Sequence, residues 1–585
     1  MPKRILKLWI SALLMLSSTQ LFAAELFFDR QNNNWSKAGN AVSEEAYRGE
    51  IKNGVPHGTG TGTLPDGTLF VGIFKDGRPD GMGILNLPDG SRFVGPVKNY
   101  RISGDGTIRF PSGNMYVGQF KNSQPWGQGT LVQSDGEKYE GQFVEGRFEG
   151  QGIYYWNDGR KYKGTFQKGQ PKGEGNFLFP DGRSYQGQVN NEQFNGEGIL
   201  KWPDGREYSG TFVNDQLDGI GSYQWPDGRT YYGNFKNNKL EGRGIYRWPD
   251  GKRYEGELND GIPHGSGAFF FPNGEKYVGD FRYGREDGEG SYTWADGRKY
   301  AGEFRNGQLN GKGSYSWPDG ALYTGEFRNG IKQGKGVYTF ADGTRYIGEI
   351  KENQPDGRGN FSFKNGREYT GDVRKGIMHG NGTLTFADKR KFTGSFKNGK
   401  IDGDGVLIWP DGKKYTGQFS ESLPDGAGTL AWPDGRIYTG EFNKGVVEGR
   451  GQLTWSNGKK IIGNFKKGLI NGPGEMNHAD GRKYIGNFQT GQKHGKGTFS
   501  WPDGRLYMGE FVKDFFQGEG TYIWPNKDRY QGNFIKGIPQ GKGTYIHADG
   551  IKFDGVFRDG LPWRGEEIDS TGKQIRRYAF GRSVE

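Results

Sequence analysis

Residues 300–322 read Tyr-Ala-Gly-Glu-Phe-Arg-Asn-Gly-Gln-Leu-Asn-Gly-Lys-Gly-Ser-Tyr-Ser-Trp-Pro-Asp-Gly-Ala-Leu, and this pattern recurs every 23 residues. Starting from Tyr47, each step of 23 reaches an aromatic residue as far as Phe553, with Ile461 as the exception, and a glycine always follows two residues later. Self-similarity at a fixed period is the signature of a stacked repeat architecture. The sequence therefore predicts an array of 23 repeats over residues 47–565, with no insertion or deletion.

Two short segments of each repeat alternate as a β-strand does, residues 300–304 and 313–317 in the quoted unit. Arg-Asn-Gly follows the first segment and Pro-Asp-Gly follows the second. Proline presets φ for a turn, aspartate hydrogen-bonds its own backbone, and glycine accepts the left-handed conformation that closes the turn. Two strands and two turns leave no room for a helix, so each repeat is predicted to be a β-hairpin.

Alternation also assigns side chains to the two faces of the predicted sheet. Tyr300 and Phe304 share one face with Tyr315 and Trp317, and we call it the aromatic face. Glycines between the rings leave slots that the rings can cover, so neighbouring strands can pack without a second sheet. We expect an all-β fold: an elongated single-layer antiparallel meander of about 23 stacked β-hairpins, twisted into a trough or superhelical ribbon.

The combination Tyr-x-Gly-x-Phe, Asn-Gly and Gly-x-Gly-x-Tyr-x-Trp-Pro-Asp-Gly resembles the MORN (membrane occupation and recognition nexus) repeat, which has the same length. The last unit departs from it, with Arg564 and Glu566 where its later glycines would be. The resemblance implies a single-layer sheet of hairpins, scaffolding, dimerisation and, in some members, association with anionic phospholipid. Some members add a catalytic domain, but residues 24–46 and 566–585 are too short for one. We expect them to be an N-terminal cap or linker and a C-terminal tail.

The composition excludes several classes of protein. The 585 residues include 107 Gly, 15 Trp, 31 Tyr, 40 Phe and no Cys. So many aromatic residues exclude wholesale disorder, and the lack of cysteine excludes disulfide scaffolds, cysteine-based metal sites and a cysteine nucleophile. His57, His264, His379 and His494 occupy one repeat position, so they lie about 50 Å or more apart at roughly 9.6 Å per repeat and cannot share a metal. We expect a protein that is not an enzyme and has no cofactor or metal site.

Residues 1–23 have the layout of a secretory signal peptide. Three basic residues precede an apolar stretch at residues 8–16, and small residues then offer a processing point after Ala23 or Ala24. The stretch is short for a membrane span of about 20 residues, and an uncleaved anchor is the alternative. We expect export to the periplasm, the cell surface or the extracellular space.

Basic residues often fill the two positions that follow the second turn of a repeat. Parity puts one member of each doublet on the aromatic face and its partner on the opposite face, so stacked repeats would form ladders of positive charge that can meet a polyanion. Acidic residues such as Glu303 and Glu326 lie on that opposite face, so a solvated edge of paired charges is the alternative. The doublets of this candidate anion-binding stripe are Arg160, Lys161, Lys252, Arg253, Arg298, Lys299, Arg390, Lys391, Lys413, Lys414, Lys459, Lys460, Arg482 and Lys483.

The tryptophans that precede the second turn of their repeats form a candidate aromatic stacking face. They recur at the repeat period, which fits packing between repeats as well as stacking against sugars. The residues are Trp202, Trp225, Trp248, Trp294 and Trp317.

Two functions remain open at this point. The leading hypothesis is a non-catalytic exported repeat scaffold that mediates protein–protein interaction in the cell envelope. The alternative is an envelope-binding module that grips anionic lipid, lipopolysaccharide or acidic glycan through the basic stripe, and the export signal disfavours nucleic acid. Strand edges near Tyr47 and residue 557 would allow self-association, and we expect residues 24–46 to cover the first edge.

Overall fold

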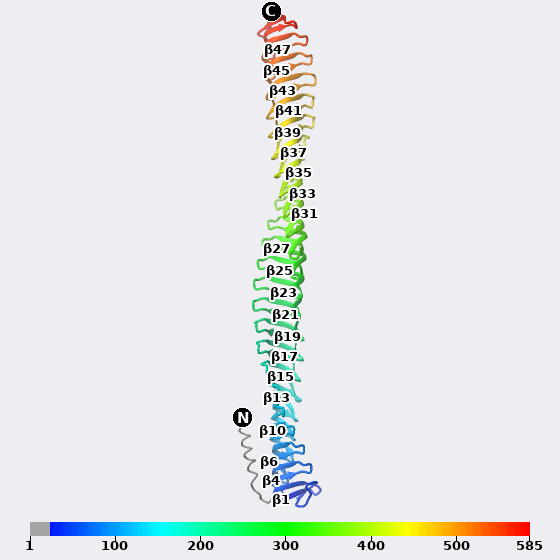
Figure 1. The fold of residues 1–585 in the computed structure, drawn as a ribbon, viewed down its shortest axis with the longest axis vertical. Coiled ribbons are helices and arrows are strands. Elements are labelled where there is room, and N and C mark those ends of the chain that lie inside the picture. The colour runs from blue at the N-terminus through cyan, green and yellow to red at the C-terminus, as the bar shows by residue number, and fades with distance from the viewer. Residues whose placement is uncertain (1–23, 585) are drawn as a thin grey trace. The chain divides into compact units, whose positions relative to one another are not determined.

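The computed structural model describes residues 24–584, which form strands and turns and no helix (Figure 1). The chain divides into two compact units, one up to Glu286 and the other from Asp287 on, a division that the uniform repeat did not predict. The predicted signal peptide, residues 1–23, lies outside the described residues. Within residues 24–584, no helix is present that could cross a membrane.

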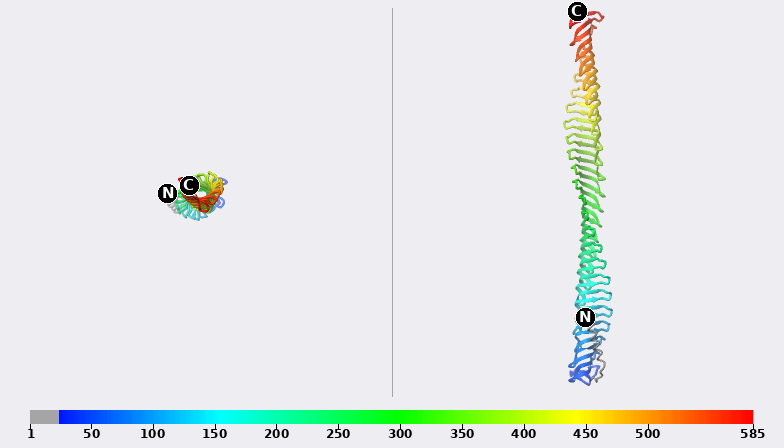
Figure 2. Two further views of the ribbon diagram at one scale, coloured as in Figure 1. Left: turned by 90° about the horizontal axis from the view of Figure 1, so that it is seen from above. Right: turned by 90° about the vertical axis from the view of Figure 1, so that its left-hand side faces the viewer.

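Within each unit the strands form a single layer and pair largely in chain order (Figures 1 and 2). The first unit contains β1 (Ala24–Asp29), β2 (Asn34–Ser36), β3 (Glu45–Lys52), β4 (Val55–Thr63), β5 (Leu69–Lys75), β6 (Arg78–Asn86), β7 (Arg92–Lys98), β8 (Arg101–Ile102), β9 (Gly104–Arg109), β10 (Met115–Lys121), β11 (Gln124–Val132), β12 (Lys138–Val144), β13 (Arg147–Tyr155), β14 (Lys161–Gln167), β15 (Gln170–Leu178), β16 (Ser184–Asn190), β17 (Gln193–Lys201), β18 (Glu207–Val213), β19 (Gln216–Gln224), β20 (Thr230–Lys236), β21 (Lys239–Arg247), β22 (Arg253–Asn259), β23 (Ile262–Phe270) and β24 (Lys276–Arg282).

The unit boundary falls inside β25 (Arg285–Thr293). The second unit continues with β26 (Lys299–Arg305), β27 (Gln308–Ser316), β28 (Leu322–Arg328), β29 (Ile331–Thr339), β30 (Arg345–Lys351), β31 (Gln354–Ser362), β32 (Glu368–Arg374), β33 (Ile377–Thr385), β34 (Lys391–Lys397), β35 (Lys400–Ile408), β36 (Lys414–Ser420), β37 (Leu423–Ala431), β38 (Ile437–Asn443), β39 (Val446–Thr454), β40 (Lys460–Lys466), β41 (Leu469–Asn477), β42 (Lys483–Gln489), β43 (Gln492–Ser500), β44 (Leu506–Val512), β45 (Phe515–Ile523), β46 (Arg529–Ile535), β47 (Ile538–Ile546), β48 (Lys552–Arg558), β49 (Leu561–Ile568), β50 (Gln574–Ala579) and β51 (Arg582–Val584).

Most repeats are an antiparallel hairpin of a seven-residue strand and a nine-residue strand, as in β26 and β27, and the predicted all-β fold of stacked hairpins is confirmed. Asn306 and Gly307 join the two strands with φ of 49° and 79°. Positive φ at both central residues defines the type I′ turn, whose twist matches that of the strands it joins. Asparagine and glycine tolerate this conformation best, which explains the Asn-Gly of the repeat.

The second turn of the repeat at residues 300–322 uses Pro-Asp-Gly as predicted. The Trp317 N–H donates to the Ala321 carbonyl at 2.9 Å, and the Gly320 N–H donates back to the Trp317 carbonyl at 3.1 Å. The Asp319 carboxylate accepts the Ala321 N–H at 2.9 Å. Gly320 has φ of +89°, the left-handed conformation that closes such a loop.

A β-bulge in the nine-residue strand interrupts each hairpin. Gly302 lies opposite Gly313, whereas Phe304 lies opposite Leu309, so the longer strand holds extra residues between these pairs. The bulge leaves the Lys312 N–H without a ladder partner, and the Glu303 carboxylate accepts it at 3.0 Å. The acidic residues on this face therefore have a structural task in addition to carrying charge.

The core lies on the aromatic face. Tyr300 is 1% exposed and donates its hydroxyl to the Glu303 carbonyl at 2.9 Å. A Cβ atom added to Gly313 would lie only 2.4 Å from the Tyr300 ring, so the ring fills the slot that the glycine leaves. The predicted pairing of glycine with aromatic residue is thus the basic packing unit of each repeat.

These rings form a ladder that joins successive repeats. Tyr300 meets Phe304 of its own repeat edge-on, with centroids 5.1 Å apart, and Phe327 of the next repeat at 5.0 Å. Tyr323 meets Phe327 in the same way at 5.2 Å. Edge-to-face pairs contribute about 0.5–1.5 kcal/mol each beyond their buried area. The ladder therefore stabilises each hairpin through its neighbours.

The N-terminal segment adds strands to the first repeat. β1 pairs antiparallel with β3, and β2 pairs with β1. The buried Glu45 carboxylate, 2% exposed, receives the Arg78 guanidinium at 2.6 Å and the Tyr100 hydroxyl. Burial nevertheless raises the pKa of Glu45 above its usual range. These contacts fix the first strand of the array to the two repeats that follow.

The C-terminal end corrects the prediction of an array without deletions. Gly555 lies opposite Gly565, one residue earlier than the repeat period would give, so β49 lacks one bulge residue. Gly565 thereby takes the place that the predicted register gave to Glu566. β50 then pairs with β49 and β51 with β50, so residues 566–584, which were expected to be a tail, contain two further strands.

Candidate functional site

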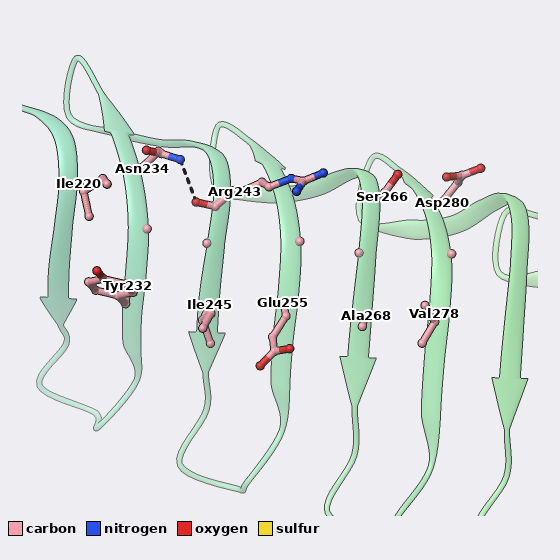
Figure 3. Close-up of a pocket in the computed structure, with 15 residues that line it drawn as sticks. Ile220, Tyr232, Asn234, Arg243, Ile245, Glu255, Ser266, Ala268, Val278 and Asp280 are labelled. Carbon is pink, nitrogen blue, oxygen red and sulfur yellow. Dashed lines mark hydrogen bonds between the residues drawn. The ribbon is translucent and has the colours of Figure 1, made fainter.

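The face opposite the aromatic face, here called the outer face, has a shallow groove in the first unit. The groove crosses β19 to β24 and encloses about 610 Å³ (Figure 3). Its floor is a row of glycines, whose Cα atoms lie between two rows of side chains in Figure 3. These floor residues are Gly233, Gly244, Gly256, Gly267 and Gly279.

The floor is bare because its glycines serve the opposite face. A Cβ atom added to Gly244 would lie 2.3 Å from the Tyr231 ring, so only glycine fits beneath that ring. Because the Cβ direction of these glycines points to the aromatic face, the outer face shows only backbone at each glycine. The residues on either side alternate outward and form the two walls.

The walls combine apolar and polar groups. One wall carries Asn234, Arg243, Ser266 and Asp280. The Asn234 amide donates to the Arg243 carbonyl at 3.1 Å, and the Arg243 guanidinium lies 3.5 Å from the Glu257 carboxylate. The mixture of charges gives this wall directional groups without a strong field of one sign.

The other wall carries the more apolar groups, Tyr232, Ile245, Ala268 and Val278, with Glu255 among them. Tyr232 is 58% exposed although it is a large aromatic side chain on a strand. Exposed apolar groups that line a concave surface with a few polar groups are typical of a binding site. The shape favours an extended ligand that lies across several strands.

The second unit repeats this arrangement on a smaller scale. A groove of about 450 Å³ has Gly359 and Gly371 in its floor, with Ile347 and Arg358 among its lining residues. Neither groove holds the asymmetric cluster that catalysis needs. Among residues 24–584, no group of three or more histidine, aspartate or glutamate side chains is placed to hold a metal ion.

Most of the first members of the basic doublets lie over the aromatic residue of their own turn. The Arg298 guanidinium lies 5.3 Å from the Trp294 ring centre, 2.6 Å from the Asp296 carboxylate, and donates to the Tyr315 hydroxyl at 3.0 Å. The Arg298 N–H also donates to Asp296, and these contacts hold the pKa of Asp296 below its usual range. Corresponding aspartate pairs are made by Arg160, Lys252, Arg390 and Arg482, and Lys413 and Lys459 lie over Trp409 and Trp455 at 4.7 Å.

The second members of the doublets have varied surroundings. Arg253 pairs with Glu255 at 3.2 Å and Lys483 with Glu475 at 2.9 Å. Lys161 lies over Tyr155 at 5.0 Å, and Lys460 is half-buried. Lys299, Lys391 and Lys414 are exposed on the outer face. The structure therefore places half of the predicted stripe in local contacts on the aromatic face and leaves scattered lysines on the outer face.

The five candidate tryptophans are half-buried and pack between repeats. Each lies 5.1–5.8 Å from the aromatic ring of the following nine-residue strand, as Trp294 does from Tyr315. Arg206, Arg229 and Arg298 lie over the rings of Trp202, Trp225 and Trp294 at 5.0–5.3 Å. Trp317 differs, because a lysine of the next repeat lies over it.

Sequence reasoning missed the outer-face groove. Alternation already put Tyr232 and Ile245 on that face, and the fixed glycines already marked a row without side chains. The alternation and the fixed glycines could therefore have indicated the groove, but the glycines were interpreted only as slots for the rings of the aromatic face.

The repeat pattern also matches a known protein family. The model of the MORN repeat matches 21 segments, from residues 47–69 to residues 530–552, and leaves residues 93–115 and those after 552 unmatched. The chain belongs to the MORN repeat family. In the unmatched repeat at residues 93–115 the nine-residue strand is divided into β8 and β9, both of which pair with β7. A comparison with curated proteins finds no match.

Several solved structures resemble parts of this MORN protein at low similarity. The TCP10 domain of CPAP from Danio rerio is 16% identical, with 42% of this chain and 99% of that chain covered and a TM-score of 0.21. The TCP domain of SAS-4 from Drosophila melanogaster, in complex with a proline-rich motif of Ana2, is 16% identical over 31% of this chain and 89% of that one, with a TM-score of 0.16. Virginiamycin B lyase from Staphylococcus aureus is 9% identical over 50% and 94%, with a TM-score of 0.10.

Proposed function

We propose that this MORN protein is an exported, non-catalytic scaffold of the cell envelope that binds an extended segment of a partner protein along the outer-face groove. The observation that carries the proposal is the glycine-floored groove between β19 and β24, because it is concave, partly apolar and long in one direction. The family is one of repeat scaffolds for protein interaction, which agrees with this use.

The export part of the proposal rests on the predicted signal peptide. The layout of residues 1–23 and the absence of cysteine both fit a protein that acts outside the cytoplasm. The location that follows is the periplasm, the cell surface or the extracellular space.

Site-directed photo-crosslinking tests the groove. A benzophenone amino acid is placed at Tyr232 in the groove and, as a matched control in the same unit, at Ile262, which is 49% exposed beside a type I′ turn. The proposal predicts one dominant crosslinked protein from position 232 and none from position 262. Equal crosslinking from both positions, or crosslinks from 262 alone, would contradict it.

A second candidate function is supported by the exposed outer-face lysines. Lys299, Lys391 and Lys414 remain exposed, and the whole chain carries a formal net charge of +11. An anionic lipid, lipopolysaccharide or acidic glycan would then be the ligand. Screening by salt weakens such binding steeply, which separates it from docking of a partner protein.

A further inference from the structure

Lys332 occupies a position of the repeat that normally holds an apolar residue. It is the second residue of β29 and lies on the aromatic face, where the preceding repeat has Leu309 and the following one has Pro355. A cation at this position has to be accommodated among the rings of the core. The contacts of Lys332 therefore show how the fold accommodates an ammonium group at an apolar position.

The Lys332 ammonium lies in a cage of four aromatic rings. Its Nζ atom is 4.3 Å from the centre of the Trp317 ring and 5.1 Å from that of Tyr315. The Tyr323 and Tyr338 ring centres are each 5.8 Å away. Rings attract a cation through their negative faces, but they offer neither a hydrogen-bond acceptor of full charge nor water.

The repeat at Lys493 provides an internal comparison. Lys493 has the same position in β43, and its Nζ lies 3.2 Å from the Asp514 carboxylate, which also accepts the Lys493 N–H. At Lys332 the corresponding acceptor of the backbone N–H is the Asn353 amide oxygen, at 2.9 Å. The amide has no charge, and no carboxylate of residues 24–584 lies within 4.0 Å of the Lys332 Nζ.

The charged and titratable groups around the cage do not replace that carboxylate. Tyr315, Tyr323 and Tyr338 have raised pKa values because of burial, Tyr323 to about 12, so they stay neutral. Arg298 donates to the Tyr315 hydroxyl and adds a positive charge. The negative charge of Asp319, in the turn, helps to raise the pKa of Tyr338. Burial without a counterion lowers the pKa of Lys332 to about 8.

We propose that Lys332 is a site of covalent acylation by an activated ester or thioester. The unprotonated Nζ attacks the acyl carbon, a C–N bond forms, and the C–O or C–S bond breaks. The departing alkoxide or thiolate takes the proton that the amine loses. The product amide is neutral, so the cage no longer has to hold a charge, and its rings can cover the acyl group.

The expected rate follows from the fraction of free amine. With the pKa lowered from 10.5 to about 8, the free fraction at pH 7.5 rises by about two orders of magnitude. The lower basicity of the amine and the half-buried position reduce this gain. We expect Lys332 to react at least about tenfold faster than Lys335, an exposed lysine three residues further along the same strand.

The test treats the purified full chain with a limiting amount of acetyl N-hydroxysuccinimide ester at pH 7.5 and measures each lysine by peptide mass spectrometry. The proposal predicts that Lys332 is acetylated first, with a half-maximal rate near pH 8. It is overturned if Lys332 reacts no faster than Lys335.

Two substitutions that exchange a side-chain amide and a carboxylate provide the matched variants. Asn353→Asp gives Lys332 the partner that Lys493 has, and its acetylation should slow at least tenfold, whereas Asp514→Asn should speed acetylation of Lys493. The Lys493–Asp514 pair shows that the fold accepts a carboxylate at this position. An unchanged rate in Asn353→Asp, with circular dichroism like that of the unchanged chain, would refute the role of the missing carboxylate.

Discussion

The slot between Gly313 and Tyr300 gives the sharpest test of how a repeat is held together. An added Cβ would lie 2.4 Å from the ring, against a normal carbon–carbon contact of about 3.5–4.0 Å. The ring is 1% exposed and held by its hydroxyl at 2.9 Å, so it has little space to retreat. Gly313→Ala should therefore cost about 1–3 kcal/mol, the range for overpacked cores.

A double-mutant cycle isolates the cause. Tyr300→Ala removes the ring and should itself cost about 3–5 kcal/mol. In that background Gly313→Ala should cost much less, because the three atoms nearest to the added Cβ all belong to the Tyr300 ring and its hydroxyl. Gly330→Ala is the matched control, since nothing lies within 4 Å of its added Cβ and only its φ of +78° opposes the change.

Amide hydrogen exchange followed by mass spectrometry is the suitable assay. The stability of such an array is the sum of the intrinsic stabilities of its repeats and of the interfaces between neighbouring repeats. The free energy of local opening, measured on peptides from β26 and β27, therefore reports the change better than global unfolding does. If Gly313→Ala costs the same with and without the Tyr300 ring, the reasoning about the slot is refuted.

Three further predictions concern this hairpin and the turn that precedes it, and they use the same exchange assay. Tyr300→Phe should cost about 1 kcal/mol because the Glu303 carbonyl loses its donor, and no loss of protection would contradict this. Glu303→Ala should loosen the bulge by about 1 kcal/mol, whereas Glu303→Gln should not, because Gln418 holds the corresponding N–H at 3.1 Å; equal effects would refute the assignment. The pKa of Asp296 is lowered in the folded chain, so the stabilisation by its carboxylate is complete above the ordinary pKa of 3.8 and is lost as the pH falls through the lowered pKa. Asp296→Asn should remove this local acid sensitivity. An unchanged pH profile in that variant would contradict the prediction.

Much of the fold could be predicted because the repeat uses residues with special conformations. Asn306 and Gly307 require left-handed backbone, and Tyr300 requires glycines on its neighbours, so one unit determines its own turns and register. The shortened last repeat could not be predicted in the same way. Gly565 is displaced by one position, and only pairing with Gly555 shows that it serves as the slot glycine.

The candidate site was harder to predict, because charge in the sequence does not show what a side chain contacts. Arg298 looks like part of a positive ladder, but Trp294 and Asp296 engage it within its own turn. Glu303 looks like a neutralising charge, but it holds the bulge. Lys332 looks like any other lysine until the four rings around it are placed.

The most direct test of the proposed function is retention of this MORN protein by a cell-envelope fraction at low and high salt. Three forms are compared: the unchanged chain, the groove variant Tyr232→Asp with Ile245→Asp, and the lysine variant Lys299→Glu with Lys391→Glu and Lys414→Glu. The account predicts retention that resists salt, is lost in the groove variant and persists in the lysine variant. Retention that disappears at high salt and is lost only in the lysine variant would contradict it and favour an anionic lipid or glycan as the ligand.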